Sequence, residues 1–151
     1  MKIMDFLDQE MIITDLKSSE KKSVIVELME ILKDKKKIKE VNEIVNVVLE
    51  REKLGSTGIG QGIAIPHGKI NILKEQIGIL GISKNGIEFN SLDGELVHII
   101  FLLVGPDIIE KHLKALYKIS SLFKDKFLRQ AIKNAATSEE IVKIIQQEDN
   151  Y

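Results

Sequence analysis

The chain has 151 residues, 44% hydrophobic and 30% charged, which is enough to close one hydrophobic core, so we expect a single domain over residues 1–151. Its 22 Lys and Arg side chains against 23 Asp and Glu leave a formal net charge of −1, which gives no field for nucleic acid or an anionic lipid surface. It has no cysteine, which excludes disulfides, thiolate metal ligands and a cysteine nucleophile on these residues. It shows neither a secretory signal nor a membrane-spanning stretch, so we expect a cytoplasmic location.

The first third of the chain predicts one short strand and two helices. The apolar residues 11–16 predict an edge strand, and apolar side chains at helical spacing predict a helix from about residue 19 to residue 35. The serines at 18–19 offer an N-cap for it. The same spacing recurs over residues 41–49, and Gly55 is well placed just past the end of this second helix.

The middle of the chain predicts the sheet. Strands are expected over residues 62–65 and 76–83, and Asn85-Gly86 predicts a hairpin turn that leads into residues 87–89. The nearly continuous apolar run 97–104 is typical of a central strand covered on both faces.

The last third predicts helices. One apolar stripe covers residues 109–123, a second follows over residues 127–135, and Thr137 with Glu140 predicts a capping box for a last helix. Helices therefore precede and follow a mixed set of strands, which predicts an α/β fold with the sheet sandwiched between helical layers.

Residues 51–69, REKLGSTGIGQGIAIPHGK, hold the densest motif of the chain. Four glycines fall within eight positions, and such a backbone can aim several N–H groups at one anion. His67 follows with an imidazole whose ordinary pKa leaves a nitrogen lone pair available for attack at neutral pH. The pattern predicts a histidine that becomes phosphorylated, its phosphoryl oxygens held by loop N–H groups. The four glycines are Gly55, Gly58, Gly60 and Gly62.

Arg51 supplies a cation to the same segment. It lies on the apolar face of the second predicted helix, seven residues after Ile44 and three after Val48, so its side chain can point toward the loop. There the guanidinium can bind phosphoryl oxygens through two parallel hydrogen bonds and disfavour protonation of His67.

Other motifs with glycines, hydroxyls or histidines do not fit the spacing. Gln61 and Gly62 stand where a P-loop needs Lys and Ser or Thr, and GxGxG replaces the GxGxxG of dinucleotide-binding folds. Ser56 and Thr57 lack the GxSxG frame of a hydrolase. The histidines at 67, 98 and 112 show no metal-binding pairing, so no metal is expected.

The segment 51–69 resembles the active-site signature of the enzyme IIA domains of the fructose, mannitol and nitrogen-regulatory branch of the bacterial phosphotransferase system. The match is nearly continuous over nineteen residues. The segment from Val97 through Gly105 and Pro106 to EKHLKAL also resembles that family's central strand and the helix with its second active-site histidine. The resemblance covers nearly the whole chain and implies a three-layer α/β/α sandwich with a mixed β-sheet.

The resemblance also implies roles for individual residues. His67 would be phosphorylated, His112 would hydrogen-bond the imidazole or the phosphoryl group, and Arg51 would stabilise the phosphoryl group. Each role has a structural alternative: His67 could be a loop histidine, His112 a satisfied residue at the edge of the core, and Arg51 a cation that favours the negative end of its helix. His98 lies outside the motif and is expected to be structural. Ser56 and Thr57 could equally form a turn. The phosphoryl-binding loop implied by the motif consists of Ser56, Thr57, Gly58, Gly60, Gly62 and Gly68.

Family members accept a phosphoryl group from the carrier protein HPr or its nitrogen-branch homologue, and sugar-specific members pass it to a cysteine of a IIB domain. Because this chain has no cysteine, any IIB partner is expected on a separate chain. We expect a phosphohistidine carrier of the nitrogen-regulatory type, whose partners are regulatory target proteins, with a fructose- or mannitol-specific IIA component as the alternative. No cofactor, nucleic-acid partner or membrane insertion is expected, and the sequence leaves the sugar, the target and the oligomeric state open.

Overall fold

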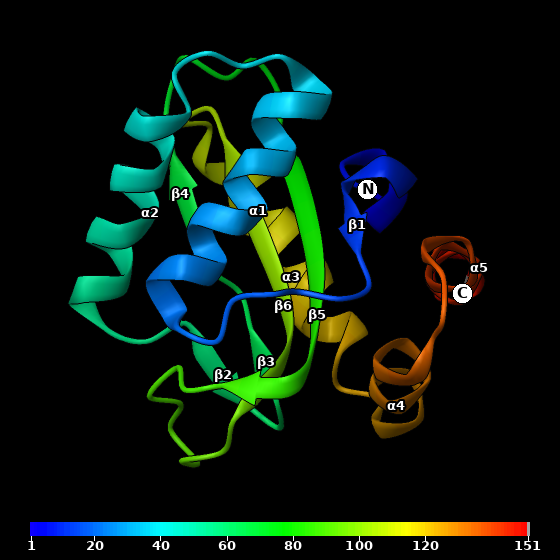
Figure 1. The fold of residues 1–151 in the computed structure, drawn as a ribbon. Coiled ribbons are helices and arrows are strands. Elements are labelled where there is room, and N and C mark those ends of the chain that lie inside the picture. Colours follow the sequence, from blue (N-terminus) through cyan, green and yellow to red (C-terminus); the bar gives the residue numbers. More distant parts are fainter. Residues whose placement is uncertain (151) are drawn as a thin grey trace.

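A mixed sheet of six strands forms the centre of the computed structural model, which describes residues 1–150 (Figure 1). The strand order is β1-β5-β6-β3-β2, and β4 pairs with β6 further along the side of β6 that β3 also uses. β5 and β6 run antiparallel, whereas β1 lies parallel to β5 and both β3 and β4 lie parallel to β6. The strands are β1 Ile12–Ile13, β2 Gly58–Gly60, β3 Ile63–Ala64, β4 His67–Lys69, β5 Ile77–Ile87 and β6 Val97–Gly105.

Helices cover both faces of this sheet. Figure 1 shows α1 and α2 in front of the strands and α3 behind them, while α4 and α5 lie near the edge that carries the chain termini. The predicted three-layer α/β/α sandwich with a mixed sheet is thereby confirmed. The helices are α1 Lys21–Lys36, α2 Val41–Leu54, α3 Ile109–Leu122, α4 Lys126–Asn134 and α5 Ser138–Asp149, with short 3-10 helices at Ile3–Asp5 and Gln9–Met11.

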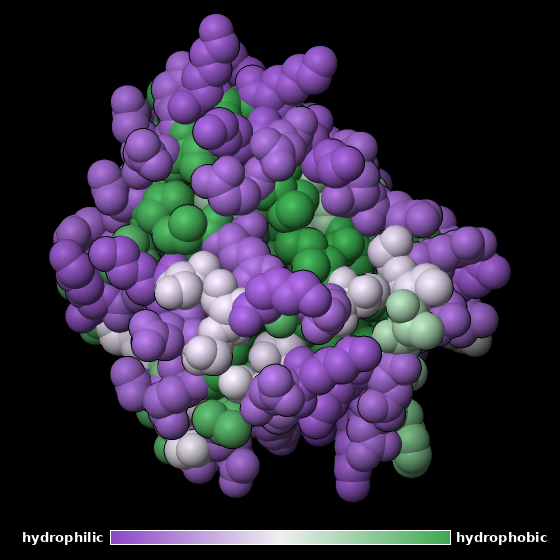
Figure 2. Space-filling view, in the orientation of Figure 1, coloured by the Kyte–Doolittle hydropathy of each residue, from purple (hydrophilic) through white to green (hydrophobic). Residues whose placement is uncertain are grey.

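The burial pattern follows the apolar patterning of the sequence. Every residue of β6 except His98 is buried, as expected for a central strand with helices on both faces. Figure 2 shows the opposite situation on the outer side of α1 and α2, where hydrophilic side chains cover most of the surface. Within residues 1–150, no helix is both long and apolar enough to cross a membrane.

Gly55 ends α2 as predicted, whereas the two predicted N-terminal caps need correction. Glu20, not a serine, precedes α1 and makes no capping bond. Ser18 lies before the helix, where its backbone N–H donates to the Glu27 carboxylate at 2.9 Å. At α5 the Thr137 hydroxyl accepts the Glu140 N–H at 3.2 Å as predicted, but the Glu140 carboxylate turns to the N–H of Ala136 and leaves the box half formed.

The hairpin predicted at Asn85-Gly86 is wrong. β5 continues through Gly86, which has a φ of +86°, and the β5–β6 register shifts between Ile82 and Ile87, so this segment is an irregularity within the strand. An Asn-Gly pair suits a bulge as well as a turn, because both use the positive φ that glycine tolerates. The chain reverses later, in residues 90–96, where Asn90 and Gly94 have φ values of 55° and 73°.

Candidate active site

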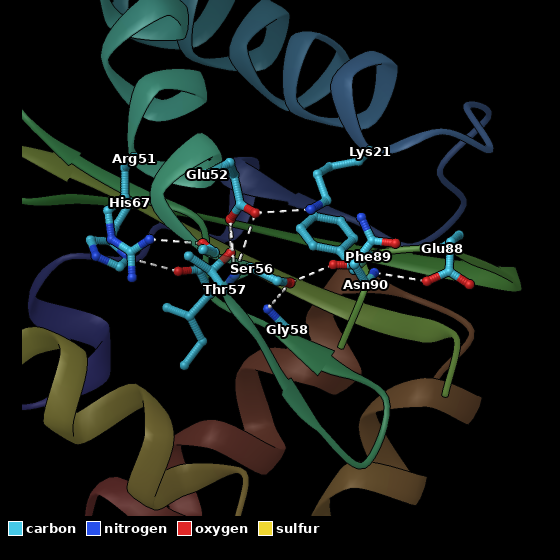
Figure 3. A network of polar contacts seen from close by, with 12 residues as sticks. Lys21, Arg51, Glu52, Ser56, Thr57, Gly58, His67, Glu88, Phe89 and Asn90 are labelled. Atoms are coloured by element: carbon cyan, nitrogen blue, oxygen red, sulfur yellow. Dashed lines mark hydrogen bonds and ion pairs between the residues drawn. The ribbon is translucent and has the colours of Figure 1, made fainter. Parts of the chain in front are cut away.

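His67 lies in β4, a three-residue strand whose pairing with β6 sets the imidazole opposite Leu103. Its Nδ1 lies 2.8 Å from the carbonyl oxygen of Ile65 (Figure 3). A carbonyl can only accept, so Nδ1 carries the proton and donates it. Nε2 is then left with a lone pair, which makes it the nucleophilic nitrogen of this ring.

The surroundings of His67 keep it neutral. Its half-buried position lowers the pKa of the imidazole below the ordinary value because burial disfavours the charged form, and the Arg51 guanidinium lowers that pKa further by repulsion. The bond to Ile65 acts in the opposite direction. The balance leaves the Nε2 lone pair free at neutral pH.

His112 lies on α3 and faces His67. The two ring centroids are 5.7 Å apart and the ring planes are tilted by 54°. His112 is 3% exposed, and burial together with the neighbouring His67 lowers its pKa to about 4. The structure therefore brings together two histidines that lie 45 positions apart in the sequence.

The depressed pKa of His112 makes stability pH-dependent. In the unfolded chain this imidazole regains its usual pKa near 6.5, so the unfolded state alone takes up a proton as the pH falls from 6.5 to about 4. The stabilisation is present above pH 6.5 and is lost over this interval. Wild type should lose on the order of 3 kcal/mol more unfolding free energy than His112→Gln over the same range, measured by urea denaturation. Parallel profiles for the two proteins would contradict this assignment.

Arg51 lies in the last turn of α2, as the helical spacing predicts. Its Nη1 donates to the carbonyl oxygen of Gly55 at 2.8 Å, which holds the guanidinium at the helix end beside His67 (Figure 3). Within residues 1–150 no carboxylate lies at ion-pair distance from Arg51. Its positive charge is therefore available to an anion.

Two adjoining hollows open beside these side chains. The larger, of about 490 Å³, contains both histidines and Arg51, and the smaller, of about 360 Å³, shares His67 and Arg51 with it. The larger is lined by Val47, Glu50, Arg51, Leu54, His67, Gly68, Lys69, His112, Leu113 and Leu116. The smaller is lined by Arg51, Ser56, Thr57, Ile59, Ile65, His67, Leu113, Leu116, Tyr117 and Ser120.

The hydroxyls of Ser56 and Thr57 both bond within the protein (Figure 3). Ser56 Oγ bonds the carbonyl oxygen of Phe89 and accepts the N–H of Gly58 at 3.0 Å. The buried Glu52 carboxylate binds the hydroxyl and the N–H of Thr57, and it also pairs with the Lys21 ammonium at 3.1 Å. These bonds brace the turn that joins α2 to the sheet, and the predicted contact of the two hydroxyls with a phosphoryl group stays a prediction.

A substitution separates the two roles of Thr57. If its hydroxyl braces the turn, Thr57→Val should lower the unfolding free energy by about 1–3 kcal/mol, because a buried carboxylate loses a partner. Phosphoryl uptake should then stay within a few-fold of wild type. Ser120→Ala is the matched control, since that hydroxyl lines the same hollow but bonds only its own helix. Unchanged stability with strongly reduced uptake would assign Thr57 to phosphoryl binding instead.

Three of the predicted loop glycines lie away from the two histidines. A Cβ on Gly58 would meet Ser91 Oγ at 2.2 Å, and Gly60 packs against the Asp93 carboxylate, which also accepts the N–H of Gln61 at 2.8 Å. Gly62 lies beside His98, and neither it nor the other two lines the hollows described above. The glycines serve the tight β2–β3 hairpin and its packing. The predicted contact of their N–H groups with a phosphoryl group stays a prediction.

Gly68 is the exception among the predicted glycines. It follows His67 in β4 and lines the larger hollow, and a Cβ there would meet Val47 Cγ1 at 2.8 Å. This contact explains the need for glycine, because α2 packs directly on the strand that carries His67.

Two residues of the site were not predicted. Lys69 ends β4 and lines the larger hollow, where its ammonium also lies 3.6 Å from the Asp107 carboxylate. Lys69 follows His67 by two residues, so both side chains lie on one face of the strand. A strand predicted over residues 67–69 would therefore have indicated Lys69 as a neighbour of His67. Gln76 bonds His112 Nδ1 at 3.0 Å, and no local pattern points to it.

Comparison with known proteins identifies the family. The model of the family described as "Phosphoenolpyruvate-dependent sugar phosphotransferase system, EIIA 2" matches residues 5–148. The chain belongs to this family. As an IIA domain it is a phosphotransfer component of that system, and the resemblance of the motif at 51–69 is confirmed by a match across nearly the whole chain.

Relatives of this IIA domain come from both branches. The fructose-specific EIIABC component of Bacillus subtilis is 34% identical over 150 residues, which are 99% of this chain but 24% of that protein. A nitrogen regulatory protein of Bradyrhizobium diazoefficiens is 34% identical over 148 residues, covering 96% of this chain and 95% of the relative. The crystal structure of nitrogen regulatory protein IIA-Ntr from Neisseria meningitidis aligns with a TM-score of 0.87 at 30% identity, over 95% of this chain and 98% of that one.

Proposed function

We propose that this IIA domain carries a phosphoryl group on Nε2 of His67, received from the phosphohistidine of an HPr-type carrier protein. The observation that carries the proposal is the hydrogen bond from His67 Nδ1 to Ile65 O, since it leaves the lone pair of the neutral ring on Nε2 of a residue that lines both hollows. The depressed pKa of His67 supports the same role because only the neutral ring is a nucleophile.

The transfer is an in-line displacement at phosphorus. The Nε2 lone pair of His67 forms the new N–P bond while the N–P bond of the donor breaks, and the donor imidazole leaves with that electron pair. His67 keeps its Nδ1 proton, and the bond to Ile65 O strengthens as the ring becomes positively charged. Arg51 and Lys69 supply positive charge to the phosphoryl oxygens, and His112 forms a hydrogen bond with one of these oxygens.

The rim of the site suits a protein donor. Leu54, Leu113 and Tyr117 are 85%, 58% and 67% exposed around the hollows that contain His67. Apolar side chains grouped at a reactive centre are typical of a protein interaction surface. They also lower the local dielectric once covered, which strengthens the attraction between the phosphoryl group and Arg51.

We place the chain in the nitrogen-regulatory branch, with regulatory proteins as its targets. The support is the match along nearly the whole length of two nitrogen regulatory proteins, one compared in sequence and one in fold. The second candidate is a fructose- or mannitol-specific IIA component, favoured by the equal 34% identity to the fructose-specific relative. That function would need a thiol outside these residues, because they include no cysteine.

Phosphoryl transfer is tested by incubating the protein with phosphoenolpyruvate, enzyme I and HPr and measuring its intact mass. One added phosphoryl group that is lost in acid and retained in base is the expected result, as a phosphohistidine requires. An unchanged mass with both HPr and its nitrogen-branch homologue would refute the proposal.

The branch is tested by its acceptor. The phosphorylated protein is mixed with a fructose-type and a mannitol-type IIB protein, and the phosphoryl group on each cysteine is measured. The nitrogen-regulatory assignment predicts no rapid transfer to either, whereas rapid transfer to one of them would establish the sugar-branch alternative. Neighbouring coding sequences give an independent indication: IIB and IIC components favour sugar uptake, and a nitrogen-type sigma factor favours regulation.

A further inference from the structure

His112 carries a buried nitrogen that no protein group satisfies. The residue is 3% exposed, and in residues 1–150 its Nε2 has no hydrogen-bond partner although the atom is shielded from solvent. Leaving a buried polar atom unpaired costs stability, so such an atom is a sign of a missing ligand or of a functional state. The larger hollow that this ring shares with His67 is where such a ligand would lie.

The side-chain amide of Gln76 decides which nitrogen of His112 holds the proton. Gln76 Nε2 donates to the carbonyl oxygen of Pro106 at 3.4 Å, and Gln76 Oε1 lies 3.0 Å from His112 Nδ1. Because the Pro106 carbonyl can only accept, the amide nitrogen must face it and the amide oxygen must face the imidazole. His112 Nδ1 is therefore the protonated nitrogen, and Nε2 of the neutral ring is a bare acceptor.

Gly105 makes this position of the amide possible. A Cβ at residue 105 would lie 2.4 Å from Gln76 Cδ, 2.4 Å from its Oε1 and 2.5 Å from its Nε2. The glycine at the end of β6 thus leaves the space in which the Gln76 amide bridges Pro106 and His112. Any larger residue would move the amide, which is the free end of a flexible side chain.

We propose that Gln76 is a positioning residue that holds His112 in the Nδ1-protonated tautomer, so that Nε2 stays empty until a phosphoryl group on His67 draws a proton onto it. The tautomer assignment stands on the contacts of Gln76 alone, whereas the proton uptake deepens the proposed function and rests on it. A lone pair at Nε2 would repel a phosphoryl oxygen, whereas a protonated Nε2 donates a charge-assisted hydrogen bond to it. Phosphorylation and proton uptake are then one linked equilibrium.

Burial first, and then the charges around His112, explain why the proton is absent before phosphorylation. His67 and Lys69 face it from β4 and disfavour a second positive charge, Arg51 lines the same hollow from α2, and Asp107 before α3 acts in the opposite direction. A phosphoryl dianion in this hollow reverses that balance. The proton comes from solvent, takes no part in the N–P exchange, and is released when the phosphoryl group leaves.

The tautomer is tested by ¹⁵N NMR of the imidazole nitrogens at a pH well above 4, without phosphorylation. In wild type His112 should show a protonated Nδ1 and a bare Nε2. Gln76→Leu and Gly105→Ala should both lose this preference, while Gln76→Glu, which retains an acceptor, should keep it. Gln130→Leu, an exposed glutamine on α4, is the control and should match wild type. A wild-type proton on Nε2, or an unchanged tautomer in Gln76→Leu and Gly105→Ala, would overturn the role of Gln76.

Proton uptake is tested by phosphorylating the protein in weakly buffered solution and recording the same spectrum. His112 Nε2 should change from bare to protonated, and uptake attributable to His112, the difference between wild type and His112→Gln, should approach one proton per phosphoryl group. A bare Nε2 in the phosphorylated protein would overturn the linkage. A protein that accepts no phosphoryl group would instead refute the proposed function, and the tautomer result above would still stand or fall alone.

Discussion

Replacement of His67 by alanine is expected to abolish phosphoryl uptake from an HPr-type donor. The variant removes the imidazole that lines both hollows, and within residues 1–150 Nε2 of His112 is shielded from the solvent side from which a donor protein would approach. His112 should therefore not substitute as a nucleophile. Intact mass after incubation with phosphoenolpyruvate, enzyme I and HPr measures the result, and the unmodified mass is expected throughout.

The matched control for this experiment is His98→Ala. His98 is also half-buried and also donates through Nδ1 to a carbonyl, that of Ser83 at 2.9 Å, but it lies in neither hollow beside His67. The His98→Ala variant should accept one phosphoryl group at close to the wild-type rate. Full modification of His67→Ala, or loss of modification in His98→Ala with the fold intact, would move the phosphorylation site away from β4.

The fold was predictable because its large elements follow simple apolar patterns. The continuous apolar run of β6 and the helical stripes of α1 and α3 report burial directly, and burial decides where these elements pack. The short strands β2 and β4 were missed. Three residues carry too little pattern to predict a strand, and these two exist because β3 and β6 offer them backbone partners.

The candidate site was only partly predictable for a related reason. The glycine density of segment 51–69 was interpreted as a concavity of N–H groups. In the structure Gly58 and Gly60 also leave space for Ser91 and Asp93, which pack against them from more than thirty residues away in the sequence. Local spacing cannot report such close approaches. It could predict the direction of Arg51, because that depends on helix geometry alone.

The pairing of the two histidines could come from family resemblance but from no pattern within the chain. His112 reaches His67 because β4 and β6 are parallel neighbours and the chain turns from the end of β6 into α3. Gln76 was invisible for the same reason, since its role depends on the space left by Gly105 and on the carbonyl of Pro106. Chemistry made of long-range contacts has to be found in the structure.

Replacement of Arg51 by glutamine is expected to slow phosphoryl uptake by about 10²–10³-fold, because removal of one preorganised donor to a transition-state oxyanion has an effect of that size. The uptake rate of Arg51→Lys should lie between those of wild type and Arg51→Gln, since a lysine retains the charge but not the paired donors. Arg129→Gln is the matched control: the second arginine donates to the Phe123 and Lys124 carbonyls and lies outside both hollows. Rates are measured by rapid quench with a phosphorylated HPr donor.

The pH profile of the same reaction separates the two effects of Arg51. His67 reacts only when neutral, so the rate falls on the acid side of its pKa, which burial and Arg51 both depress. Arg51→Gln removes the electrostatic contribution and retains the burial, so the acid limb should move to higher pH while the plateau drops. A lowered plateau with an unmoved limb would mean that the guanidinium acts on the phosphoryl group alone. If its role were only to favour the helix end, worth about 0.3–1 kcal/mol, stability would change while the plateau and the limb stayed at wild-type values.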